Sequence, residues 1–119
     1  MLDAVLHIRV QNALNNREHW RKRAARAKAE RAHVNAHLRS WLDHTDAPLV
    51  VTLTRIAPRP FDDDGLAASF KAIRDEVASL LGRDDNPKAG IAWRYEQARG
   101  RPREYAVRIR IERADEVTT

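Results

Sequence analysis

The run Leu49–Ile56, LVVTLTRI, constrains the fold of this chain more than any other segment. It is dense in β-branched residues and has few polar ones, which is typical of a strand in the middle of a sheet. The following residues 57–60, Ala-Pro-Arg-Pro, must end the strand, because proline lacks a ladder donor and restricts the residue before it. The acidic residues that begin at Asp62 therefore follow a strand end directly.

Alternation and helical periodicity place further elements on both sides of this strand. They are a strand at 4–10, a helix at about 17–42, a helix at about 66–81 and strands at 91–96 and 105–112. Asn16 is the expected N-cap of the first helix, and Gly82 ends the second. The last two strands are expected to form an antiparallel hairpin. The order β-α-β-α-β-β predicts one small α+β domain over residues 1–119, with helices packed on a mixed sheet.

Positive charge gathers in the first helix. Residues 17–39 contain eight Lys and Arg residues against two Glu residues, a net charge of +6, whereas the whole chain has +5. Such a helix can contact phosphates and set affinity and salt dependence without reading sequence. The candidate DNA-binding residues are Arg17, Arg21, Lys22, Arg23, Arg26, Lys28 and Arg31. The alternatives are a solvated helix face, or a dimer contact, since Trp20 and Trp41 are large for a free surface.

Three adjacent carboxylates, Asp62, Asp63 and Asp64, stand out in this basic chain. Like charges raise one another's pKa unless a cation lies among them, and Mg²⁺ prefers such oxygen ligands. Asp62 and Asp64 point the same way if the segment is extended. On one continuous helix, Lys71 and Asp75 would share a face onto which Asp64 extrapolates.

The apolar stripe of that helix falls on the opposite side and is expected to face the sheet. It consists of Leu66, Phe70, Ile73, Val77 and Leu80. Each acidic element also has a plainer interpretation: the first three aspartates as helix caps, Lys71 with Asp75 as an exposed ion pair, and Asp84 with Asp85 as turn formers. Only their combination indicates a metal site.

Residues 61–97, from FDDDGLAASFK to AWRYEQ, resemble the core of the RusA-type Holliday-junction resolvases, a family of phage and prophage endonucleases. The matching features are an Asp-x-Asp element after a strand, a helix with Lys-x-x-x-Asp, a Leu-Gly helix end, an Asp-Asp pair and a following strand. The likeness covers roughly residues 49–112. It implies a small α+β homodimer that binds four-way DNA junctions and uses Mg²⁺, for which Mn²⁺ can substitute, to nick two opposing strands.

The resemblance also implies roles for individual residues. Asp62 and Asp64 match the paired acidic ligands, Lys71 the helix lysine, and one of Asp84 and Asp85 the third essential carboxylate, with Asp85 favoured. The catalytic set is then Asp62, Asp64, Lys71 and Asp85, the metal ligands come from Asp62, Asp64, Asp84 and Asp85, and Asp75 is a supporting residue.

Two departures from the family pattern bear on activity. Gly65 stands where the family usually has Asn, so an amide that could orient a ligand is missing, and losses of this kind cost about 10–100-fold in metal affinity or activity. The lysine also lies three residues further along. The alternative is therefore a catalytically weak or inactive DNA-binding dimer, in which Gly65→Asn would raise nicking. A third interpretation is a protein-interaction module whose acidic turn only caps a helix.

Composition excludes several other classes. With no cysteine, the chain has no disulfide, thiolate nucleophile or cysteine-ligated cluster. No apolar run approaches the roughly 20 residues of a membrane span, and the N-terminus does not resemble a secretory signal, so a cytoplasmic protein with no membrane partner is expected. His33 and His37 have metal-ligand spacing, but without the Glu of the zinc-protease motif we interpret them as exposed polar residues. No small-molecule cofactor is expected.

Overall fold

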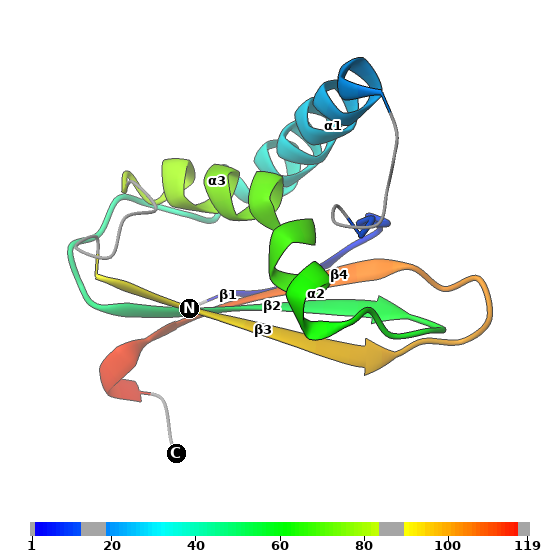
Figure 1. Cartoon of the computed structure of the whole chain (residues 1–119). Helices are drawn as coiled ribbons and strands as arrows, with labels where there is room; N and C mark the ends of the chain where they lie inside the picture. Colours follow the sequence, from blue (N-terminus) through cyan, green and yellow to red (C-terminus); the bar gives the residue numbers. More distant parts are fainter. Residues whose placement is uncertain (1, 13–18, 84–89, 117–119) are drawn as a thin grey trace.

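The computed structural model in Figure 1 describes residues 2–12, 19–83 and 90–116. The elements in chain order are β1 (Leu2–Leu6), α1 (Trp20–Leu38), β2 (Leu49–Ala57), α2 (Asp63–Ser69), α3 (Lys71–Leu80), β3 (Ile91–Arg99), β4 (Ala106–Arg113) and the 3-10 helix η2 (Ala114–Glu116). The predicted α+β class and the predicted mixed sheet are confirmed. None of the helices in the described ranges has the length and apolar character needed to cross a membrane.

The sheet has four strands in the order β1-β4-β2-β3. β2 is its central strand, as its apolar sequence predicted: it pairs with β3 in parallel and with β4 antiparallel. The expected hairpin between the last two strands is therefore wrong, because β3 and β4 lie on opposite sides of β2. The buried β2 has backbone donors and acceptors on both edges, and pairing with both neighbours satisfies them.

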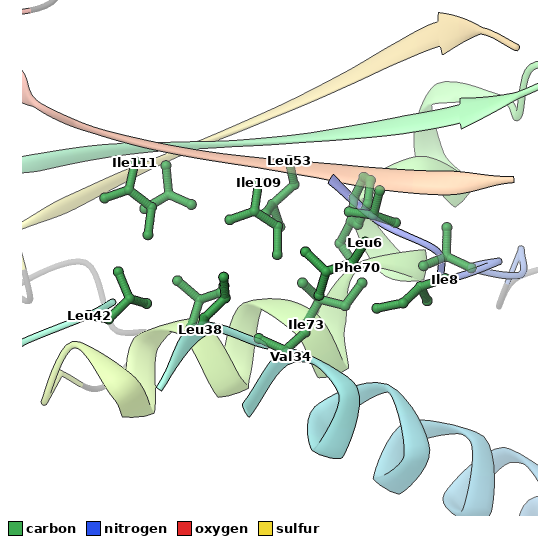
Figure 2. Close-up of a cluster of buried hydrophobic side chains, with 14 of the residues drawn as sticks. Leu6, Ile8, Val34, Leu38, Leu42, Leu53, Phe70, Ile73, Ile109 and Ile111 are labelled. Carbon is green, nitrogen blue, oxygen red and sulfur yellow. The ribbon is translucent and has the colours of Figure 1, made fainter. Parts of the chain in front are cut away.

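All three helices cover one face of the sheet, and the core lies between the two layers (Figures 1 and 2). From the sheet, Leu53, Ile109 and Ile111 point toward the helices, and Val34 of α1 and Ile73 of α3 meet them there. These five side chains are fully buried. Burying a residue of this size contributes about 1.5–3 kcal/mol, so this contact is the main source of stability of the two-layer arrangement.

α1 is shorter than the sequence suggested. Its N-cap is His19, whose Nδ1 accepts a hydrogen bond from the Arg21 backbone, whereas Asn16 lies outside the described residues. The helix ends at Leu38 and not at residue 42. Its buried positions all lie in its second half, and its first half stands clear of the core, as Figure 1 also shows.

The predicted second helix is divided into α2 and α3. Phe70 breaks it with φ −94° and ψ 3°, and its ring is fully buried beside Tyr95, 5.9 Å between ring centroids. The apolar stripe does face the core. The prediction that Asp64 shares a face with Lys71, however, assumed one continuous helix. That assumption is wrong, because the break at Phe70 divides the segment into α2 and α3.

The end of α3 confirms the role of Gly82. Its φ of +73° is a conformation that other residues rarely adopt. The Arg83 amide donates to the Ala78 carbonyl over 2.8 Å, which closes the helix in the usual way.

A buried carboxylate ties the basic helix to α3. Glu76 is 9% exposed and accepts hydrogen bonds from Arg31 Nε at 3.0 Å and from Asn35 Nδ2 at 3.2 Å. Both donors are on α1. One turn away, the exposed Lys71 pairs with Asp75 within α3.

Glu76→Ala should therefore lower the free energy of unfolding by about 2–3 kcal/mol, because hydrogen bonds to charged groups are lost and Asn35 is left without its acceptor. The matched control is Asp75→Ala, which removes an exposed ion pair and should change stability by no more than about 1 kcal/mol. Urea denaturation of both variants checks this. Equal effects would show that Glu76 does not secure α1.

Candidate nucleic-acid and metal site

The acidic turn lies at the carboxyl ends of two parallel strands. β2 and β3 end together, with Ala57 paired to Arg99, and the chain then turns through residues 58–62 into α2. Crevices at the carboxyl ends of parallel strands are the usual place for ligands in α/β sheets. The position predicted for the acidic cluster is therefore one where a ligand can approach.

Two neighbouring strand residues fix this turn. Arg55 and Gln97 are partners in the β2–β3 register. Gln97 accepts from the Phe61 amide at 2.7 Å and donates to the Phe61 carbonyl at 2.9 Å, while Arg55 donates to the Arg59 carbonyl at 2.6 Å and stacks 3.4 Å from the centroid of the Phe61 ring. The residue directly before Asp62 is thus held from both strands.

Asp62 is the N-cap residue of α2, but it does not cap the helix with its side chain. Its backbone is extended, with φ −65° and ψ 152°, and its carbonyl accepts from the amides of Gly65 and Leu66. The side chain is exposed, and no other described side chain pairs with its carboxylate. For Asp62, therefore, the capping interpretation does not hold, and the carboxylate is available to a cation or a donor.

Gly65 is buried under the side chain of Asn12. A Cβ placed on Gly65 would lie 2.5 Å from Asn12 Oδ1 and 2.6 Å from Nδ2, closer than atoms can approach. Any larger residue at this position would require the Asn12 side chain to move. The close approach also brings an amide from the segment after β1 next to the acidic turn, so Gly65→Asn would have to displace Asn12 before it could add an amide of its own.

An arginine pocket adjoins the turn. It has a volume of about 410 Å³, and the polar side chains that line it are Arg55, Arg59, Arg99 and Gln97, with no carboxylate among them. Arg55 is 7% exposed, and burial lowers the pKa of its guanidinium below the ordinary value, although arginine stays protonated in proteins. Guanidinium groups suit phosphate oxygens, so this pocket complements an anion.

The remaining residues of the predicted site either lie away from the acidic turn or are not among the described residues. Lys71 Nζ contacts Asp75 at 3.1 Å, and both residues line a groove between α1 and the α2–α3 pair. Among the described contacts, none joins Lys71 to Asp62. Asp84, Asp85 and Arg17 lie outside the described residues, as do the side chains of Asp63 and Asp64.

The basic helix presents most of its predicted DNA-binding residues to solvent. Arg21, Lys22, Arg23, Lys28 and Arg31 are exposed and Arg26 is half-buried. They do not form one face. The groove beside α2 and α3 is lined by Arg23, Arg26 and Arg31, and the last of these also pairs with Glu76.

The two histidines of α1 lie against each other. The rings of His33 and His37 are 4.5 Å apart, and the Nδ1 atom of His37 lies 3.0 Å from the His33 carbonyl, to which it donates. Burial lowers the pKa of His33, and the neighbouring His37 and His7 lower it further. Among the described side chains, which do not include those of Asp63, Asp64, Asp84 and Asp85, no group of three or more His, Asp or Glu residues is arranged to bind a metal ion.

Comparison with protein-family models gives no match for this chain, and comparison with curated proteins gives none either.

Sequence reasoning missed Arg55, Gln97 and Asn12. Arg55 could have been noticed as a cation at an inward position of an otherwise apolar strand. Gln97 continues the inward alternation of Trp93 and Tyr95, so its orientation was also open to inference. Nothing in the sequence pointed to the contact between Asn12 and Gly65, which joins segments more than fifty residues apart.

Gln97→Leu should destabilise the protein by about 1–3 kcal/mol, because both Phe61 backbone groups lose their partners. Gln97→Glu keeps the acceptor but loses the donor, and should cost less. Glu96→Gln, on the exposed side of the same strand, is the control and should stay within about 0.5 kcal/mol. Urea denaturation measures all three, and an unchanged Gln97→Leu would mean that the clamp adds no stability.

His33 should make stability depend on pH. Because its pKa is lower in the folded protein than the ordinary 6.5, the unfolded chain binds more protons below that pH. The free energy of unfolding should therefore fall as the pH drops from about 7.5 to about 5.5, and His33→Gln should reduce this loss.

His44→Gln is the control, since His44 is exposed and contacts Gly82 instead. Urea midpoints at the two pH values provide the measurement. A pH dependence that is the same in the wild type and in His33→Gln would contradict the assignment.

Proposed function

We propose that this protein is a Mg²⁺-dependent endonuclease that cuts branched DNA, with the four-way junction as its preferred substrate. The observation that carries the proposal is the Asp62 carboxylate, which is exposed, does not cap α2 and has no partner among the described side chains. It lies at the carboxyl ends of two parallel strands, beside a pocket of arginines. An available carboxylate next to a phosphate-complementary pocket suits metal-assisted cleavage of a phosphodiester.

The residues at the turn fit a hard divalent ion. Asp62 supplies oxygen ligands, and Asp64 and Asp85, with Asp84 as the alternative to Asp85, would complete the set proposed from the sequence. Mg²⁺ or Mn²⁺ bound there would act as a Lewis acid at the scissile phosphate and lower the pKa of a bound water. The products would be a 5′-phosphate and a 3′-hydroxyl.

The other residues would bind and orient the substrate. Arg59 and Arg99 at the arginine pocket would contact phosphates next to the scissile bond, and Lys71 would stabilise developing charge or orient the nucleophile. The exposed cations of α1 would supply sequence-independent affinity. Cutting two opposing strands calls for two sites, so we propose a homodimer, which would act in the cytoplasm.

A DNA-binding dimer without activity is the second candidate. It is favoured by the place of Lys71, whose described partner is Asp75 in the groove beside α1. A lysine held there would contribute to DNA binding and not to the reaction at Asp62. The third candidate, a protein-interaction module, predicts neither Mn²⁺ binding nor DNA affinity.

The purified protein should nick a synthetic four-way junction with Mg²⁺ or Mn²⁺ and not with EDTA. Asp62→Asn and Asp64→Asn should each abolish nicking and leave junction affinity within a few-fold, because Asn keeps the size of the side chain but loses the charge that holds the ion. Gel assays of nicking and fluorescence anisotropy of binding measure the two effects separately.

Asp43→Asn is the matched control, an exposed aspartate away from the turn in sequence, and should nick as the wild type does. A clean preparation that binds junctions but never nicks would reject the enzyme and leave the DNA-binding dimer. Equal loss of nicking and binding in the Asp62 and Asp64 variants would point to misfolding, which their urea midpoints would reveal. If the protein has no affinity for DNA and calorimetry detects no binding of Mn²⁺, the protein-interaction module is the candidate that remains.

A further inference from the structure

A groove separates the exposed half of α1 from α2 and α3. Its volume is about 370 Å³, which lies within the range of small-ligand sites. Small side chains form much of its lining, from Ala24 and Ala27 on α1 and from Ala68 and Ala72 on the opposite helices. The two helices therefore leave between them an apolar slot.

Trp20 lines this groove and is 64% exposed. Its large apolar ring is therefore accessible to a ligand that lies in the groove. The guanidinium of Arg21 lies 5.3 Å from the centroid of the ring, and the His19 ring lies 5.5 Å away. The guanidinium beside the indole favours an anionic ligand.

Cations outnumber carboxylates along the groove. Arg23, Arg26, Arg31 and Lys71 line it, against Glu30 and Asp75. The formal charge of this lining is therefore +2, with Lys71 paired to Asp75 and Arg31 paired to Glu76 of α3. A ligand that matches both features has a flat apolar part and negative charge, which describes a nucleotide better than an apolar helix or an acidic peptide.

We propose that this groove binds an unpaired nucleotide segment of a DNA strand, with a base stacked on Trp20 and its phosphates on Arg23, Arg26 and Lys71. The proposal rests on the proposed function, because the branched DNA supplies the strand. Stacking on an aromatic side chain needs a base that is free of its duplex partner, and every base has a face to offer. The groove therefore selects unpaired strands and not a sequence.

The position of the groove connects it to the acidic turn. α2 begins at Asp63, next to Asp62, and its last residues, Ala68 and Ser69, line the groove. Seven helical residues span about 10 Å. A strand that passes the acidic turn can therefore reach the groove within a few nucleotides, so that unpaired bases near a branch point lie in the groove while the phosphodiester lies at the turn.

The test compares two exposed tryptophans: Trp20, which is in α1, and Trp41, which is in the turn after α1. Trp20→Ala should weaken binding of a fluorescein-labelled oligo-dT by about 5- to 150-fold, the range that loss of one base stack gives. Trp41→Ala is the matched control, since Trp41 is 76% exposed and does not line the groove, and it should bind within twofold of the wild type. Trp20→Phe should keep much of the affinity, and a blunt duplex should be bound equally by all the variants.

Salt dependence separates stacking from charge. Trp20→Ala should leave the slope of log affinity against log salt unchanged, whereas Arg23→Gln should reduce it by about one phosphate contact. Urea midpoints of Trp20→Ala and Trp41→Ala report whether either variant is misfolded. All binding is measured by anisotropy in EDTA, so that neither metal nor cleavage is needed.

Equal affinity of Trp20→Ala and Trp41→Ala for oligo-dT would overturn the proposal. So would a Trp20→Ala protein whose only change, by sedimentation, is its oligomeric state, because the groove would then hold a second copy of the chain. Loss of oligo-dT affinity in Trp20→Ala, in a protein that never nicks, would support the groove and reject the nuclease. Junction nicking with oligo-dT affinity independent of Trp20 would reject the groove alone.

Discussion

The backbone of β2 is hydrogen-bonded along both edges, in parallel to β3 and antiparallel to β4. Every position from Leu49 to Arg55 is buried, so none of these backbone groups can be left to water. Because β3 is parallel to β2, the chain returns through the helices α2 and α3 before it forms β3. It then crosses to the other side of β2 to form β4. The α2–α3 crossover and the turn that carries Asp62 are consequences of this parallel pairing.

The elements themselves were largely readable from the sequence, and the pairing was not. Alternation predicted the inward faces of β3 and β4, but two alternating strands joined by a short loop fit a hairpin as well as they fit two neighbours of a third strand. The break at Phe70 was equally hidden. Helical periodicity continues through Phe70, so the pattern of apolar residues did not mark the position of the break.

The candidate site was also predictable from the sequence only in part. Charge alone singled out Asp62, because three adjacent carboxylates in a basic chain need an explanation, and the proline-terminated strand placed it at a sheet end. The residues that hold the turn could be identified only from the tertiary structure. The Gln97 side chain bonds to the backbone amide and carbonyl of Phe61, and Asn12 contacts Gly65 from another part of the chain. Neither charge nor sequence periodicity distinguishes an amide side chain that has such a role from one that does not. The amide of Asn12 thus lies beside the acidic turn although it is far from the turn in sequence.

The acidic turn and α1 have opposite charges, and only the second half of α1 packs on the sheet, while its basic first half stands clear of it. The residues of α1 have a net charge of +5, and such a helix laid against the acidic turn would neutralise the turn and leave neither surface for a polyanion. Instead, Glu76 holds α1 through Arg31 and Asn35 near its second half, while its first half diverges and opens the groove. The buried Glu76 pairs with Arg31 where the helices touch, and Arg21, Lys22 and Lys28 are exposed elsewhere on α1. Separation of this kind lets one small domain attract phosphate along α1 while keeping a carboxylate open to a cation at the sheet end.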